Sequence, residues 1–327
     1  MRPLPFKPPI LVRNKHLQTI ISSKKSPIIG GMVNHEQLID IKVHTDEMVH
    51  LTGYYSSQNE KQAKGLVILL HGWLGCDKST YMLARGERLY QEGYDVFRLN
   101  MRDHGSTVAL NKGLFHGCRL NEVFQAIKKI AELKPDLPLY LVGFSMGGSF
   151  ALRVGWQQSI EALPIKNLKK IVAICPSVNP AQVTDAIDKS ILYRSYFCNK
   201  WKANLLEKQK HFPELYDFNS LFSLKSCKQI TEALIKQYSE YPDLEAYFAE
   251  YHFSQEKLKA VCVPMTVLAA ADDPVIPIEG FQELKQINPF FDLNITHYGG
   301  HVGYINALSG SSWLDMVLPS LLSDKPL

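Results

Sequence analysis

The stretch Gly143-Phe144-Ser145-Met146-Gly147-Gly148 decides the fold, because it sets a serine between a predicted strand and a predicted helix. The four residues before it, 139–142, are apolar and typical of a buried strand, whereas residues 149–154 are typical of a helix. A turn this sharp leaves little room for side chains, which explains the glycines on both sides of the serine. We therefore predict that Ser145 is a nucleophile at a helix N-terminus, where backbone N–H groups favour negative charge.

The loop after an earlier apolar run suits an oxyanion hole. Residues 66–70 predict a buried strand, which ends in His71-Gly72-Trp73-Leu74-Gly75. Where a serine nucleophile follows a strand, one N–H of such a loop and the N–H after the nucleophile bind the oxyanion. We therefore predict that the N–H groups of Trp73 and Met146 form the oxyanion hole, each contributing roughly 3 kcal/mol in the transition state.

Two more strand ends carry the other groups of a catalytic triad. The apolar residues 265–271 predict a strand that ends in two candidate acids, Asp272 and Asp273. Further along the chain, His301 lies in a glycine-rich loop that lets its imidazole reach over the sheet edge. His297 is a second candidate base, but it falls within a predicted strand and is expected to be structural. The chain order serine, aspartate, histidine is that of the α/β-hydrolase fold.

From residue 66 onward, predicted strands alternate with predicted helices, which indicates a mostly parallel sheet with helices on both faces. The predicted fold class is α/β, specifically an α/β-hydrolase fold, with residues 1–327 in a single domain. Residues 1–36 are expected to form an irregular, proline-rich arm. Residues 179–258 interrupt the alternation and are rich in aromatic residues, which predicts a helical cap inserted between the sixth and seventh strands. Those rings can line a substrate pocket or pack the core of the cap itself.

Composition and charge argue against several other classes of protein. The net charge of +4 is spread along the chain without a basic stripe, which argues against a nucleic-acid-binding protein. No apolar run approaches the roughly 18 residues of a membrane span, and the N-terminal residues are too proline-rich for a secretory signal. We therefore expect a cytoplasmic protein. No glycine-rich phosphate loop is present, so no cofactor is expected.

The cysteines and histidines form no metal-binding pattern. His116-Gly117-Cys118 lacks a second pair of ligands at zinc spacing, so no metal site is expected. The 6 cysteines are scattered without paired spacing, which favours free thiols in a reducing compartment. Cys175 and Cys262 lie in apolar runs and are expected to be buried and unreactive.

The N-terminal arm carries a more specific signal. It contains Asn14-Lys15-His16-Leu17-Gln18-Thr19, and a stretch that ends in His-Leu-Gln-Thr resembles the YheT-like branch of the α/β hydrolases. The resemblance spans nearly the whole chain, through residues 71–72, 100–102, 143–148, 271–274 and 299–303. It implies a relation to the eukaryotic α/β-hydrolase-domain lipases and esterases, and hydrolysis of carboxylic esters. We expect His16 to tie the arm to the body of the protein rather than to act in catalysis.

The resemblance also indicates which aspartate is the acid of the triad, and it shows one position at which this chain departs from the family pattern. Acids of this family commonly lie four residues before the second proline-containing turn, and Pro277 puts that position at Asp273. Asp273 is therefore the predicted acid of the triad. Members of the branch usually have Arg-Gly after the fourth strand, whereas Asp103 and His104 follow Arg102 here, which leaves the shape of this loop and the fit of the substrate open.

The predicted activity is that of a serine esterase or lipase, which cleaves carboxylic esters through Ser145, His301, Asp273 and an acyl-enzyme intermediate. Its predicted partner is a small ester or lipid-like substrate. An acyltransferase or a thioesterase would use the same triad, and product analysis with an added alcohol separates these activities. A non-catalytic binding protein of the same fold is expected to have lost part of the triad, and this chain retains all three residues.

Overall fold

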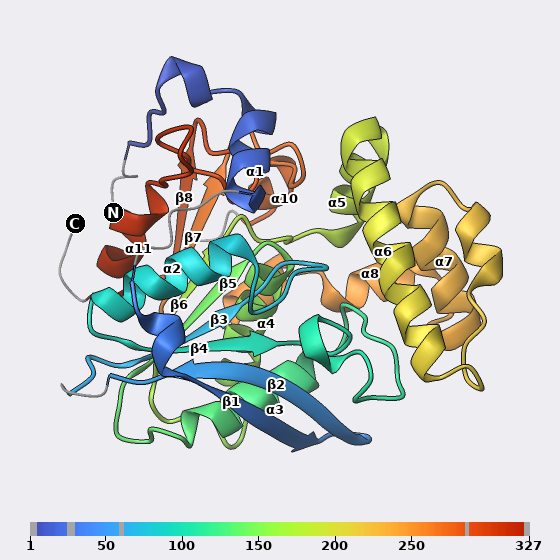
Figure 1. The fold of residues 1–327 in the computed structure, drawn as a ribbon, viewed down its shortest axis with the longest axis horizontal. Coiled ribbons are helices and arrows are strands. Elements are labelled where there is room, and N and C mark those ends of the chain that lie inside the picture. The colour runs from blue at the N-terminus through green and yellow to red at the C-terminus, as the bar shows by residue number, and fades with distance from the viewer. Residues whose placement is uncertain (1–4, 25–29, 59–61, 285–287, 324–327) are drawn as a thin grey trace.

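One eight-stranded sheet forms the centre of the computed structural model, which describes residues 5–24, 30–58, 62–284 and 288–323. The strand order is β1-β2-β4-β3-β5-β6-β7-β8 (Figure 1). Strands β1 (Glu36–His44) and β2 (Met48–Ser56) form an antiparallel pair, and β2 is also antiparallel to β4. The other strands are parallel: β3 (Leu66–Leu70), β4 (Asp95–Asn100), β5 (Leu139–Phe144), β6 (Leu168–Ile174), β7 (Met265–Ala270) and β8 (Phe291–Thr296). The predicted α/β-hydrolase fold class is confirmed.

Helices cover both faces of this sheet, and β3 shows why. Its five residues are all buried, but Leu66, Ile68 and Leu70 join one apolar core while Val67 and Leu69 join the other. Successive side chains of a strand point to opposite faces, so each face needs its own cover. The first core is closed by α3 (Leu120–Ala131) and α4 (Met146–Ile160), and the second by α2 (Thr80–Gln91) and α11 (Leu314–Leu322).

The N-terminal arm is more ordered than the prediction of an irregular segment. Residues 1–4 and 25–29 of this arm lie outside the described residues. Between them the chain forms a short 3-10 helix, Ile10–Val12, and then the ten-residue helix α1 (Lys15–Lys24), which packs against α2. The expectation of an irregular arm is therefore wrong for α1, whose amphipathic pattern is short and follows a proline-rich stretch.

Between β6 and β7 the chain forms five α-helices and one short 3-10 helix, Asn219–Ser223. The α-helices are α5 (Pro180–Lys189), α6 (Ile191–His211), α7 (Cys227–Tyr238), α8 (Leu244–Tyr251) and α9 (Gln255–Lys259), and we call this segment the helical insertion. In Figure 1 most of the insertion projects to one side of the sheet. The first four α-helices each begin after a residue whose side chain accepts a hydrogen bond from the first turn: Asn179, Ser190, Ser226 and Asp243. Such caps satisfy N–H groups that have no partner inside the helix.

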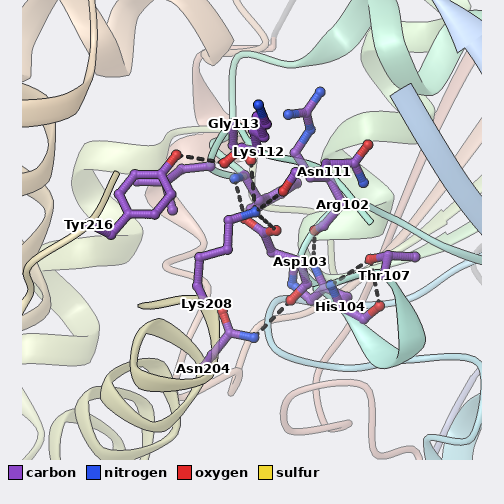
Figure 2. Close-up of polar contacts among 12 residues, drawn as sticks. Arg102, Asp103, His104, Thr107, Asn111, Lys112, Gly113, Asn204, Lys208 and Tyr216 are labelled. Carbon is purple, nitrogen blue, oxygen red and sulfur yellow. Dashed lines mark hydrogen bonds and ion pairs between the residues drawn. The ribbon is translucent and has the colours of Figure 1, made fainter. Parts of the chain in front are cut away.

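A buried ion pair ties the insertion to the loop after β4 (Figure 2). The Nζ atom of Lys208 on α6 donates to Asp103 Oδ1 over 2.7 Å, and also to the carbonyl oxygens of Asn111 and Gly113. The Nδ2 atom of Asn204, one turn earlier on α6, donates to the carbonyl oxygen of Asp103. Burial raises the pKa of Asp103 and lowers that of Lys208, and the attraction between the two groups opposes both shifts. All three Lys208 donors are thus used to hold α6 on this loop.

The same pair explains the departure from Arg-Gly. Asp103 has a φ of 57°, a left-handed conformation that glycine adopts freely and aspartate tolerates better than most residues. The backbone therefore keeps the shape that a glycine would give. The added carboxylate accepts from Lys208 and from the N–H of Phe115, so the side chain adds a contact to the insertion.

We predict that Lys208→Met lowers the free energy of unfolding by about 3–5 kcal/mol, because it leaves the buried Asp103 carboxylate without its partner. The double variant Asp103→Gly/Lys208→Met should recover most of this loss, since glycine relieves the strained φ and removes the unpaired charge. Urea unfolding followed by circular dichroism measures both values. Lys210→Met, on the exposed side of the same helix, is the matched control. Equal losses in the single and double variants would contradict the argument.

Candidate active site

Ser145 lies at a strained turn between β5 and α4. Its backbone has a φ of 55° and a ψ of −118°, and its N–H donates to the carbonyl oxygen of Ile174 at the end of β6. A Cβ atom on Gly143 would come within 2.1 Å of the Gly147 carbonyl oxygen, and one on Gly147 within 2.3 Å of the Leu70 carbonyl oxygen. Only glycine fits at these two positions, so the turn requires glycine at both. The result is a serine side chain presented above the sheet.

The structure brings Ser145, His301 and Asp273 into one hydrogen-bonded chain. His301 Nε2 lies 2.9 Å from Ser145 Oγ, and His301 Nδ1 lies 2.9 Å from Asp273 Oδ2. The carboxylate can only accept, so the imidazole proton belongs on Nδ1 and the lone pair of Nε2 faces the serine hydroxyl. The Asp273 side chain is 2% exposed and that of His301 12%, so water reaches the base more readily than the acid.

The two neighbouring aspartates have different contacts. Asp273 uses Oδ1 to accept from the N–H groups of Val275 and Ile276, which leaves Oδ2 directed at His301. Asp272 instead accepts from the N–H of Gly300 over 2.9 Å, and burial raises its pKa. Asp273 therefore orients the imidazole, while Asp272 holds the loop that carries it. The rival base His297 is exposed and lies against Tyr298, outside this chain of hydrogen bonds.

The predicted oxyanion loop, residues 71–75, lies directly beside the serine. A Cβ atom on Gly72 would come within 3.3 Å of Ser145 Cβ, and the N–H of Gly72 donates to the hydroxyl of Tyr81. His71 is fully buried and organises the loop: its Nδ1 bonds the Gly72 carbonyl oxygen, and its Nε2 accepts from the N–H of Met101. Burial lowers the pKa of His71 to about 4, so this imidazole is neutral.

The arm contacts residues 297–305, which carry His301 and which we call the histidine loop, a role that sequence reasoning missed. Gln18 is fully buried on α1; its Nε2 donates to the carbonyl oxygens of Val12 and Ile305, and its Oε1 accepts from the N–H of Ile305. The neighbouring Thr19 Oγ1 accepts from the N–H of His301 over 2.9 Å. The polar Gln-Thr pair at the end of the His-Leu-Gln-Thr stretch was the signal that could have found these contacts. His16 Nδ1 lies 2.9 Å from the Tyr193 hydroxyl, so α1 also touches the insertion.

Two cavities meet at Ser145. The inner chamber, about 120 Å³, extends under the insertion, and its wall includes Met146, Ser177, Val183, Thr184, Trp201 and Phe248. The outer chamber, about 260 Å³, lies between α1 and the start of α6, and its wall includes Ile20, Ser23, Leu192, Tyr193, Tyr196 and His301. A smaller distal pocket of about 60 Å³ shares Trp73 and Trp201 with the inner chamber. The ring of Trp73 stacks on Phe197 and meets Trp201 edge-on, so these rings separate the chambers.

Some aromatic residues of the insertion pack its own core and others line a cavity, so both roles that the sequence left open occur. Tyr216, Phe218 and Tyr238 pack against one another, and Phe218 is fully buried in the apolar core. In contrast, Trp201 lines the inner chamber and Tyr196 lines the outer one. The packed rings come from the loop after α6 and from the end of α7, whereas the two cavity-lining rings come from α6.

The acid and base also lie near a thiol. The side chains of Cys175, Asp273 and His301 each offer an atom within 4.8 Å of the others. Both ring nitrogens of His301 are engaged by Ser145 and Asp273, and burial raises the pKa of Cys175 well above its usual value. This chemistry does not suit a metal ion. Cys175 is buried as expected. Cys262 is exposed, so the expectation is wrong for this residue, which lies in the loop before β7, between Val261 and Val263 in the sequence.

Comparison with known proteins shows the family to which the chain belongs. The family described as "Serine aminopeptidase, S33" matches residues 61–301. The chain belongs to this family of α/β hydrolases. Its relatives include bovine Phospholipase ABHD3, 23% identical over 77% of this chain, and Escherichia coli YheT, 22% identical over 82% of this chain and 79% of YheT. The predicted relation to the YheT-like branch and its eukaryotic counterparts is thereby confirmed. The match to the bovine phospholipase spans 61% of that protein's length.

Solved structures show the same fold for this S33-family chain. The Pyrococcus furiosus esterase Pf2001 superposes with a TM-score of 0.57, at 18% identity, over 91% of this chain and 96% of the esterase. This likeness shows the fold, whereas the family and its relatives place the chain among the esterase- and lipase-like α/β hydrolases. Within the described residues, none of the helices combines the length and the apolar character that crossing a membrane requires.

We predict that Asp273→Asn slows the reaction of Ser145 with a fluorophosphonate probe by on the order of 10⁴-fold, because an amide at this position stabilises the wrong imidazole tautomer. Asp272→Asn should cost far less, since its amide oxygen can still accept from the N–H of Gly300. The labelling reaction is quenched at successive times, and the labelled fraction is measured by mass spectrometry. A larger loss in the Asp272 variant would show that Asp272, and not Asp273, is the acid of the triad.

Proposed function

We propose that this protein is a serine hydrolase that cleaves carboxylic esters through an acyl-enzyme intermediate. The observation that supports this most is the chain of two 2.9 Å contacts from Ser145 Oγ through the His301 imidazole to Asp273, set between two cavities. A serine hydroxyl is a poor nucleophile at neutral pH, and a base at hydrogen-bonding distance removes that limitation. The cytoplasmic location of the protein stays a prediction.

In the proposed reaction, Ser145 Oγ attacks the ester carbonyl while His301 Nε2 takes the hydroxyl proton. The N–H groups of Trp73 and Met146 bind the oxyanion that forms, and Asp273 stabilises the imidazolium. The C–O bond to the alcohol then breaks, His301 returns the proton to the leaving oxygen, and the acyl group stays on Ser145. Water activated by the same imidazole releases the carboxylic acid. The close approach of Gly72, which precedes Trp73, to Ser145 supports the oxyanion assignment.

The helical insertion is proposed to act as a cap that selects the acyl chain. Met146, which follows the nucleophile, lines the inner chamber together with residues of α5, α6, α7 and α8. The wall of this chamber is mainly apolar, and the distal pocket extends it past Trp201. An apolar chain bound there gains about 0.8 kcal/mol for each methylene that it buries. We therefore assign the acyl half of the ester to the inner chamber.

We predict that Ser145→Ala abolishes hydrolysis of p-nitrophenyl esters, with kcat/KM lower by several orders of magnitude, because no nucleophile remains. The variant should keep its unfolding temperature, since the hydroxyl contributes no packing. Turnover is measured at 405 nm in parallel with thermal unfolding. A folded Ser145→Ala protein with near-normal turnover would remove the central proposal.

We predict that kcat/KM for p-nitrophenyl esters rises with acyl length and then falls steeply where the inner chamber ends. Trp201→Ala should shift the optimum to longer chains, because the lost ring opens the distal pocket to the acyl chain. The optimum is read from a series of saturated acyl groups at constant pH. If Trp201→Ala leaves the optimal acyl length unchanged, the helical insertion does not select the acyl chain as proposed.

A further inference from the structure

We infer that the outer chamber binds the alcohol half of the ester and that this half is apolar, so that the substrates carry apolar groups on both sides of the carbonyl. The inference rests on the proposed function and adds a substrate class to it.

The position of His301 assigns the two halves. His301 contributes to the wall of the outer chamber, whereas Met146 contributes to the wall of the inner one, and Ser145 lies in both. When the tetrahedral intermediate collapses, the bond between the carbonyl carbon and the alcohol oxygen breaks, and His301 Nε2 gives that oxygen its proton. The leaving oxygen must therefore be within hydrogen-bonding distance of Nε2. The alcohol then extends into the outer chamber.

The opening of the outer chamber suits the order of product release. Its rim includes Leu192 and Tyr196, which are 51% and 50% exposed, and the exposed Ser23 and Lys24 of α1. The alcohol must leave first, while the acyl group is still bonded to Ser145, and water must then reach the carbonyl on the His301 side. A chamber with an exposed rim allows this exchange without release of the acyl chain from beneath the insertion.

Lys24 and Tyr196 lie at the exposed rim of the outer chamber, and the side-chain hydroxyls that α1 and Tyr193 contribute to this chamber are already bonded within the protein. The hydroxyls of Ser22 and Ser23 donate to the carbonyl oxygens of Thr19 and Ile20 of the same helix. The Tyr193 hydroxyl is bonded to His16 Nδ1, and Thr19 Oγ1 both donates to the Lys15 carbonyl oxygen and accepts from the N–H of His301. A polar alcohol would lose its bonds to water here without an equal replacement, which costs free energy.

Apolar side chains supply the remaining surface. Ile20 reaches the chamber from α1, Leu192, Tyr196 and Phe197 reach it from α6, and Val302 follows the histidine. Methylene groups of the alcohol that lose water against this surface add to binding in proportion to the area buried. An alkyl chain or the apolar remainder of a lipid therefore fits the chamber, and a small hydrophilic alcohol does not.

Two ester series test the inference on the full-length protein. One series keeps a butyryl group and lengthens an n-alkyl alcohol from propyl to octyl, over which the intrinsic reactivity of the ester hardly changes. The other keeps a propyl alcohol and lengthens the acyl group. For each, kcat/KM is measured by pH-stat titration for the native protein, Tyr196→Ala and Trp201→Ala. Tyr196 is half exposed, so its loss is not expected to prevent folding.

We expect kcat/KM to rise along the alcohol series by up to about fourfold for each buried methylene. Tyr196→Ala should flatten the alcohol series and leave the acyl series unchanged, whereas Trp201→Ala should move the optimum of the acyl series to longer chains and leave the alcohol series unchanged. A flat alcohol series, or a Tyr196→Ala effect confined to the acyl series, would overturn the inference while ester cleavage by Ser145 stands. If no ester is cleaved and fluorophosphonate does not label Ser145, the proposed function itself fails, and the inference with it.

Discussion

The strained backbone of Ser145 is the constraint on which the rest of the site depends. A φ of 55° holds the side chain above the sheet, and the contacts around Gly143 and Gly147 leave space for no other residue there. The serine hydroxyl can meet His301 Nε2 only if the turn keeps this shape, because β5 and the histidine loop reach the same edge of the sheet from different strands. A relaxed turn would point the hydroxyl elsewhere and leave the imidazole without a partner.

The histidine loop is fixed by hydrogen bonds from two parts of the chain, Asp272 and the helix α1. Asp272 accepts a hydrogen bond from the N–H of Gly300. From α1, Thr19 accepts from the N–H of His301 and Gln18 accepts from the N–H of Ile305. Loops are the most mobile parts of a fold, so a base carried on one needs such contacts to stay within reach of the nucleophile. The arm, which lies more than 200 residues from His301 in the chain, is thereby part of the architecture of the site.

The insertion is held separately, through Lys208 and Asp103. Their buried pair fixes α6 against the loop after β4, and α6 supplies walls to both chambers. A buried ion pair adds little net stability compared with apolar packing, but it is specific in position, because any displacement leaves a charge unpaired. The aspartate in the usual glycine position is therefore consistent with a loop that positions a substrate-contacting helix.

The sequence by itself determined the fold class and the strand ends that carry Ser145, Asp273 and His301, since these follow from short apolar runs, glycines and chain order. Parallel strands bring their carboxyl ends to one edge, so residues far apart in the chain could be expected to meet there. Only the tertiary structure decided that α1 forms hydrogen bonds with the histidine loop and that Lys208 pairs with Asp103. It also decided which rings of the insertion face a cavity. These contacts join segments whose separation and orientation depend on the packing of the whole chain, and local sequence patterns carry no record of that packing.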